Sequence, residues 1–75
     1  MTSKEFDMQM ILLGFIKSDY KNTPKTITWW ELTPNSLVRV RTLHNRSSFS
    51  IYLENFTVQD IRSRTKTIKI LQANM

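Results

Sequence analysis

Two successive segments of the chain alternate apolar with polar residues, and this period of two constrains the fold more than any other feature. Between residues 37 and 54, apolar side chains occupy every second position of each segment, with charged or polar side chains between them. Successive residues of a strand point to opposite faces, so the pattern predicts two antiparallel strands with one buried and one solvated face. We predict that the buried face holds Val38, Val40, Phe49, Ile51 and Leu53, leaving Arg39, Arg41 and Tyr52 on the other.

The residues before these segments predict a third strand of the same sheet. Residues 25–32 are rich in the threonine, isoleucine and tryptophan that favour strands. Thr33–Ser36 is typical of a turn, with proline at its second position, and His44–Ser48 is the next predicted turn. Trp29 and Trp30 are adjacent, so they point to opposite faces, and at least one is expected in the core. Trp30 is considered for the arginine-bearing face.

The N-terminal segment favours a helix over residues 4–18. Thr2 and Glu5 have the spacing of a capping box, and the residues that follow are mostly good helix formers. On a helix, the apolar side chains would cover an arc wider than one sheet face needs. A strand is the alternative, because Phe6, Met8 and Met10 alternate with polar residues as far as Met10.

Two interpretations compete for the C-terminal segment. Residues 57–60 resemble a helix start, and a continuous helix would run to Leu71. The alternative is a short helix followed by a fourth strand, because residues 65–71 are rich in β-branched side chains and Ile68 and Ile70 flank Lys69. The expected fold is therefore one α+β domain with an N-terminal helix, a three-stranded antiparallel meander and a C-terminal helix, or a short helix plus a fourth strand.

This order of elements is similar to that of the double-stranded RNA-binding domain, a family of comparable length. That family contacts RNA through its first helix, a histidine-containing loop between strands one and two, and lysines that open its last helix. The matching loop here, Thr33–Ser36, has no histidine, and the expected last helix has its first base only at Arg62. The resemblance is one of topology, so we do not transfer the activity.

Composition argues against catalysis. The 75 residues include no cysteine, one histidine and one glycine. Thiolate nucleophiles, disulfides and thiolate metal sites are therefore excluded, and a single glycine does not build a phosphate-cradling loop. We expect no enzymatic activity, no cofactor, no metal and no small-molecule substrate. The longest apolar stretch, residues 10–16, is far shorter than the roughly 20 residues of a membrane span, so we expect a cytoplasmic protein without membrane contact.

Charge is distributed unevenly along the chain and suggests an anionic partner. Residues 1–36 carry four bases and four acids, whereas residues 37–75 carry seven bases and two acids. All five arginines lie in the second half, and their planar guanidiniums match phosphate groups well. Arginines interleaved with aromatic residues favour nucleic-acid binding, to DNA or RNA. The candidate nucleic-acid contacts are Arg39, Arg41, Arg46, Tyr52, Arg62, Arg64, Lys66 and Lys69.

The alternative function is docking on another protein. A phage- or mobile-element-type inhibitor or adaptor would bind a larger host protein or a nucleoprotein complex, with the basic half facing an acidic surface. Aromatic residues and methionine suit adaptable protein interfaces. The candidate interface residues are Met8, Ile11, Phe15 and Trp30. The broad apolar arc of the N-terminal segment also predicts self-association, for example as a homodimer.

Overall fold

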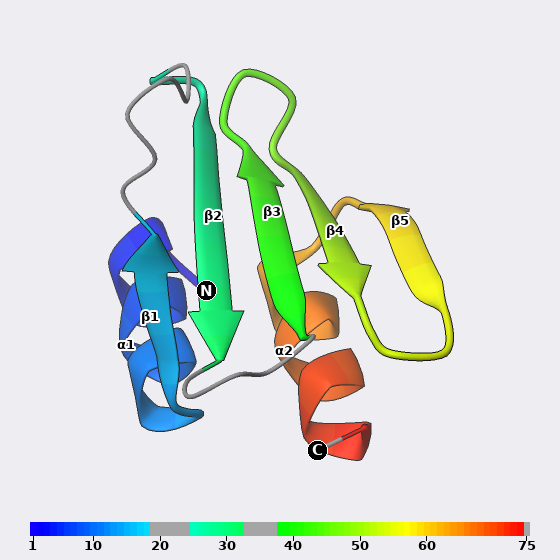
Figure 1. Cartoon of the computed structure of the whole chain (residues 1–75). Coiled ribbons are helices and arrows are strands. Elements are labelled where there is room, and N and C mark those ends of the chain that lie inside the picture. The colour runs from blue at the N-terminus through cyan, green and yellow to red at the C-terminus, as the bar shows by residue number, and fades with distance from the viewer. Residues whose placement is uncertain (19–24, 33–37, 75) are drawn as a thin grey trace.

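The computed structural model describes residues 1–18, 25–32 and 38–74, which form one sheet and two helices (Figure 1). The elements in chain order are α1 (Ser3–Leu12), β1 (Phe15–Ser18), β2 (Ile27–Leu32), β3 (Arg39–Leu43), β4 (Ser48–Tyr52), β5 (Thr57–Ile61) and α2 (Arg64–Ala73). The α+β class with a helix at each end is thus confirmed. The predicted number of strands, three or four, is too small, because the sheet has five.

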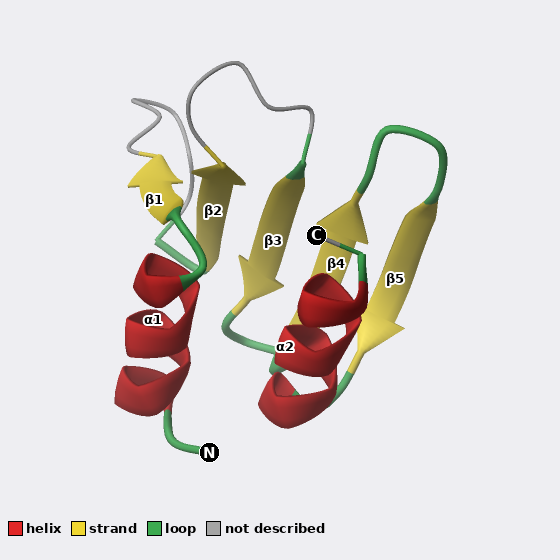
Figure 2. Cartoon of the chain, turned by 90° about the horizontal axis from the view of Figure 1, so that it is seen from below, coloured by secondary structure: helices red, strands yellow, loops and turns green. Residues whose placement is uncertain are grey.

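The sheet is an antiparallel meander in which each strand pairs with the next along the chain. Both helices lie side by side on the same face of this sheet, as Figure 2 shows. The opposite face, which we call the open face, is turned toward the viewer in Figure 1 and carries no helix. The fold therefore has two layers, one of helices and one of strands, with the core between them.

The predicted buried face of β3 and β4 is confirmed, although Ser48 and Ser50 on the other face of β4 are buried too. Val40, Phe49 and Ile51 are buried beneath the helices, and Val38 and Leu53 pack against the same core. Residues directly opposite each other on paired strands share a face, and Val40 lies opposite both Trp30 and Ile51. The full core comprises Phe6, Met10, Phe15, Trp30, Val40, Phe49, Ile51, Ile61, Ile68 and Leu71.

Phe6 of α1 anchors the helix layer to the sheet. Its ring centroid lies 4.9 Å from that of Phe49 and 6.5 Å from that of Trp30, the latter in an edge-on arrangement. Such aromatic pairs add roughly 0.5–1.5 kcal/mol each beyond the burial of their surface. Trp30 and Phe15, both expected at an interface, are only 2 % exposed and belong to this core. Assigning them to a docking surface was therefore wrong.

Helix α1 ends well before the predicted limit at residue 18. Thr2 and Glu5 form the expected capping box, and the hydrogen bond from the Thr2 backbone N–H lowers the pKa of the Glu5 carboxyl. Gly14, however, has φ of +97°, a conformation that glycine adopts far more readily than other residues. The chain reverses there, and Phe15–Ser18 becomes the edge strand β1. The alternating pattern at Phe6–Met10 is helical, so the strand alternative was wrong there.

The C-terminal helix is confirmed, but it begins later than predicted, and the strand of this segment precedes the helix instead of following it. Thr57–Ile61 pairs with β4 and has an irregular register, with Asp60 at φ of +60°. Helix α2 then begins after Ser63, whose side chain accepts a hydrogen bond from the Lys66 backbone N–H. The β-branched residues of 65–71 are helical because Thr67, Ile68 and Leu71 fall on one face of α2, where they are buried.

The predicted turns have different outcomes. Residues 44–47 form the turn between β3 and β4, close to the expected span. The turn expected at Thr33–Ser36 lies outside the described residues. With five strands, the order of elements departs from that of the double-stranded RNA-binding domain. Within the described ranges, neither helix is long and apolar enough to cross a membrane.

Replacing Gly14 by alanine should destabilise the fold. A side chain at this positive φ is strained, and its Cβ would lie 3.3 Å from Leu32 Cδ1. We expect a loss of about 1–2 kcal/mol, measured by urea denaturation. The control is Met8→Ala on the exposed side of α1, expected to change stability by less than about 0.5 kcal/mol. Equal stability of Gly14→Ala and the parent would contradict the reversal at this position.

The two tryptophans should respond differently to truncation. Trp30→Ala removes a core ring and should cost about 3–5 kcal/mol. Trp29→Ala removes a ring from the open face and should cost about 1–2 kcal/mol, from its aromatic and cation–π contacts. Thermal denaturation of the matched pair measures the difference. A larger loss for Trp29→Ala would mean that the faces of β2 are exchanged.

Candidate functional site

Four side chains from the three central strands gather on the open face. Trp29 of β2 lies directly opposite Arg41 of β3, and Arg39 of β3 lies directly opposite Tyr52 of β4. Opposite residues share a face, and residues two apart on a strand share it as well. The register alone therefore places all four together. We call Trp29, Arg39, Arg41 and Tyr52 the platform.

Within the platform, the two rings meet above the central strand. Their centroids lie 5.7 Å apart with an interplanar angle of 35°, although β2 and β4 are not neighbours. The Cζ atom of Arg39 lies 5.5 Å from the Trp29 centroid and 5.9 Å from that of Tyr52. The Cζ atom of Arg41 lies 5.9 Å from both. Both guanidiniums therefore lie within cation–π distance of both rings.

Trp29 is the platform residue that the sequence analysis did not assign. Adjacent tryptophans on a strand point to opposite faces, but the local sequence does not say which points outward. Trp30 was considered for the arginine face, and the structure places it in the core instead. The register of β2 against β3 would have decided it, because the residue opposite Val40, a predicted core residue, must share its buried face, and that residue is Trp30.

A polar hollow of about 320 Å³ adjoins the platform. Arg41 belongs to both features, and its Nε atom is buried without a hydrogen-bond partner in the described structure. The side chains of Ser48 and Ser50 are almost fully buried there. We call this feature the arginine hollow; it is lined by Arg41, Leu43, Arg46, Ser48, Ser50, Gln59, Asp60 and Arg62.

Asp60 places one carboxylate in the arginine hollow. The irregular register of β5 and the positive φ of Asp60 bring its Oδ1 atom within 3.3 Å of Ser48 Oγ and of Arg62 Nε. Both members of the Arg62–Asp60 pair are mostly exposed, so the pair adds little stability. Three guanidiniums against one carboxylate leave the hollow with an excess of positive charge.

The remaining predicted nucleic-acid contacts do not join the platform. Arg64, Lys66 and Lys69 belong to α2, which packs on the opposite face of the sheet (Figure 2). Lys66 and Lys69 are exposed on that helix, and Arg64 Nη1 donates a hydrogen bond to the Met1 carbonyl at 3.3 Å. The bases of α2 are therefore separated from Arg39 and Arg41 by the sheet, whereas Arg46 and Arg62 line a hollow together with Arg41.

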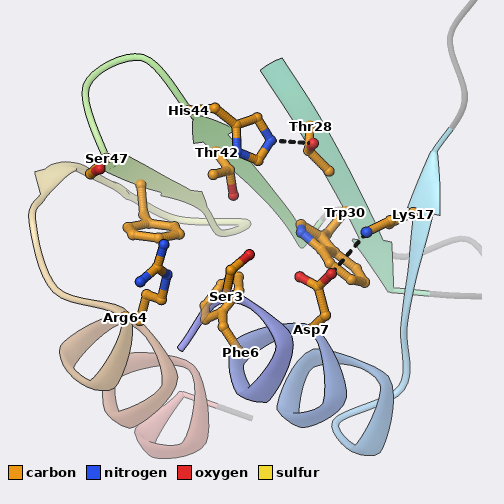
Figure 3. Close-up of a pocket in the computed structure, with 11 residues that line it drawn as sticks. Ser3, Phe6, Asp7, Lys17, Thr28, Trp30, Thr42, His44, Ser47 and Arg64 are labelled. Carbon is orange, nitrogen blue, oxygen red and sulfur yellow. Dashed lines mark hydrogen bonds and ion pairs between the residues drawn. The ribbon is translucent and has the colours of Figure 1, made fainter. Parts of the chain in front are cut away.

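A second hollow, of about 240 Å³, lies between the helix layer and the sheet and is lined by residues of both helices and of β1 to β4 (Figure 3). Two pairs of its polar groups contact each other, whereas the buried Oγ1 atom of Thr42 has no hydrogen-bond partner among the described residues. Lys17 Nζ donates to Asp7 Oδ2 at 2.9 Å, and Thr28 Oγ1 lies 2.6 Å from His44 Nε2. No group of three or more potential metal ligands occurs among the residues that the structure describes. We regard the open face as the stronger candidate because the tryptophan in this hollow is buried and its Lys17 is already paired with a carboxylate.

The predicted protein interface is only partly at the surface. Met8 and Ile11 are exposed on α1, as are Leu12 and, on β1, Ile16. Ile11 and Ile16 line a common hollow beside Phe15 and Trp30. These four exposed side chains, Met8, Ile11, Leu12 and Ile16, form what we call the apolar strip.

Comparisons with protein-family models, with curated protein sequences and with solved structures find no significant match. Functional arguments for this chain therefore rest on its own side chains. The open face combines aromatic rings with positive charge, the two features that suit a ligand carrying both phosphates and flat bases.

Proposed function

We propose that this protein binds nucleic acid through the open face of its sheet. The observation that carries the proposal is the platform, where two aromatic rings and two guanidiniums interleave on the solvent side of the central strands. Aromatic rings offer stacking surface to bases, and arginines pair with phosphates and also stack.

The charge around the platform supports an anionic ligand. Arg46 and Arg62 extend the positive surface toward the turn after β3 and the end of β5. Counter-charges near these arginines come from Glu31, which lies opposite Arg39 on β2, and from Asp60. Four arginines therefore outweigh two carboxylates on this side of the molecule, whose net charge is +5. Binding should accordingly be salt-dependent, through release of counterions from the nucleic acid.

Neutralising the platform arginines should weaken binding more than neutralising the bases of α2. The double variant Arg39→Gln/Arg41→Gln removes two charges from the open face, and Lys66→Gln/Lys69→Gln removes the same charge from the helix layer. With four arginine–phosphate contacts, the logarithmic salt slope should be about −3.6 on duplex DNA or about −2.8 on a single strand. The platform variant should halve that slope, and the α2 variant should preserve it.

Fluorescence anisotropy of a labelled oligonucleotide, titrated at several salt concentrations, measures both slopes. Circular dichroism of the two variants checks that the fold is retained. Equal weakening in both variants would indicate general charge attraction rather than a site on the open face. No binding by the parent protein at low salt would contradict the proposed function.

The second candidate function, docking on a protein, is favoured by the apolar strip. Ile11 and Leu12 are 63 % and 76 % exposed, which is unusual for two adjacent large apolar residues of one helix. A protein inhibitor or adaptor of the mobile-element type would use this strip, which follows α1 and the edge strand β1. Self-association through the same strip stays a prediction.

Sedimentation equilibrium tests that prediction. The parent protein should form a dimer whose fraction rises with concentration. The double variant Ile11→Ser/Leu12→Ser should be monomeric, because it removes apolar surface from the apolar strip. Lys66→Ser/Lys69→Ser is the control and should dimerise like the parent. A parent that remains strictly monomeric at high concentration would contradict self-association.

A further inference from the structure

The position of the platform within the sheet restricts the form of nucleic acid that can reach it. The rings of Trp29 and Tyr52 meet above β3, with two strands on either side. Strands in a sheet lie about 4.8 Å apart, so the five strands span roughly 19 Å between the outer axes. The major groove of B-DNA is about 12 Å wide and admits a helix or a two-stranded ribbon. A five-stranded surface is too broad to enter it.

The helices offer no alternative route into a groove from this side. Both lie behind the sheet when the open face is viewed directly (Figure 1). A duplex resting on the open face would present its phosphates, while its stacked and paired bases would stay out of reach of rings at the centre of the sheet. Bases that are unpaired can turn outward and lie flat on aromatic side chains.

We propose that the open face binds single-stranded nucleic acid, with unpaired bases stacking on Trp29 and Tyr52. The inference rests on the proposed function and specifies its substrate class. The shared chemistry is an unpaired base on a sugar–phosphate chain, which single-stranded DNA and RNA both supply.

The contacts within the platform prepare it for this ligand. Each ring has the Cζ atoms of both arginines close to it, at 5.5 to 5.9 Å from its centroid. Aromatic side chains already held in place lose little conformational freedom when a base stacks on them. The guanidiniums also lie beside any base on the rings, where they can contact the adjoining phosphates.

The arginine hollow supplies a place for a phosphate next to the platform. Arg41 contributes to both features, so a base on the rings and a phosphate in the hollow would be neighbours on one strand. The Nε atom of Arg41 is buried without a partner, so a phosphate in the hollow would satisfy that donor once the Arg41 side chain shifts toward it. The small side chains of Ser48 and Ser50 leave the space that the phosphate would fill.

Tryptophan fluorescence tests this inference directly, because the two tryptophans differ in exposure. Trp30 is 2 % exposed and shielded from ligands, whereas Trp29 lies on the platform. The probes are a mixed-sequence oligonucleotide of about 12 nucleotides as DNA, the same sequence as RNA, and the DNA strand annealed to its complement. The proteins are the parent, Trp29→Phe and Trp29→Ala, each checked by circular dichroism.

The parent should bind the single strands at least about tenfold more tightly than the duplex, with quenching of its fluorescence on binding. Trp29→Phe keeps a stacking ring, so it should bind within about threefold of the parent while losing the quenching. Trp29→Ala should weaken single-strand binding about tenfold or more and leave duplex binding nearly unchanged. Comparison of the DNA and RNA strands identifies which sugar is preferred.

Three results would overturn the inference. Equal or tighter binding of the duplex, or single-strand binding without quenching, would exclude stacking on Trp29 while leaving nucleic-acid binding itself in place. Absence of binding to any probe at low salt would remove both the inference and the proposed function. The quenching experiment uses the parent protein, so its outcome does not depend on whether a variant folds.

Discussion

The packing of Phe6 between Trp30 and Phe49 determines which face of the sheet is buried. These rings come from α1, β2 and β4, so their contact fixes one helix against the middle of the sheet. Once that face is covered, the period of two in each strand requires that the alternate residues point to solvent. The arginines of β3 and the outer tryptophan of β2 are therefore brought together by the same constraint that forms the core.

Some elements of the fold can be predicted from short stretches of sequence, and others cannot. The alternation at Val38–Leu53 is strong because the two faces of β3 and β4 differ in polarity, and it was sufficient to predict their buried side. Gly14 is a local signal for the end of α1 that the favourable helix composition outweighed. The strand β5 gave no such signal, because its irregular register breaks the period and Thr57–Asp60 resembles a helix start.

The candidate site, too, has residues that local sequence predicts and residues that it does not. Arg39, Arg41 and Tyr52 were predicted to share a face because that follows from strand geometry alone, and the structure places them together. The side of the sheet on which α2 packs is a tertiary property, set by the burial of Thr67, Ile68 and Leu71, and no local pattern states it. For that reason the sequence alone did not decide whether the bases of α2 lie beside the arginines of the strands.

Chemical-shift mapping by NMR is the most direct measurement of the central claim, that nucleic acid binds the open face. A ¹⁵N-labelled sample of the protein would be titrated with a single-stranded oligonucleotide, following every backbone amide and both indole N–H groups. The account predicts the largest shifts at the Trp29 indole and in β2, β3 and β4, with Lys66 and Lys69 of α2 unchanged. Shifts concentrated on the two helices, with the Trp29 indole unmoved, would contradict it.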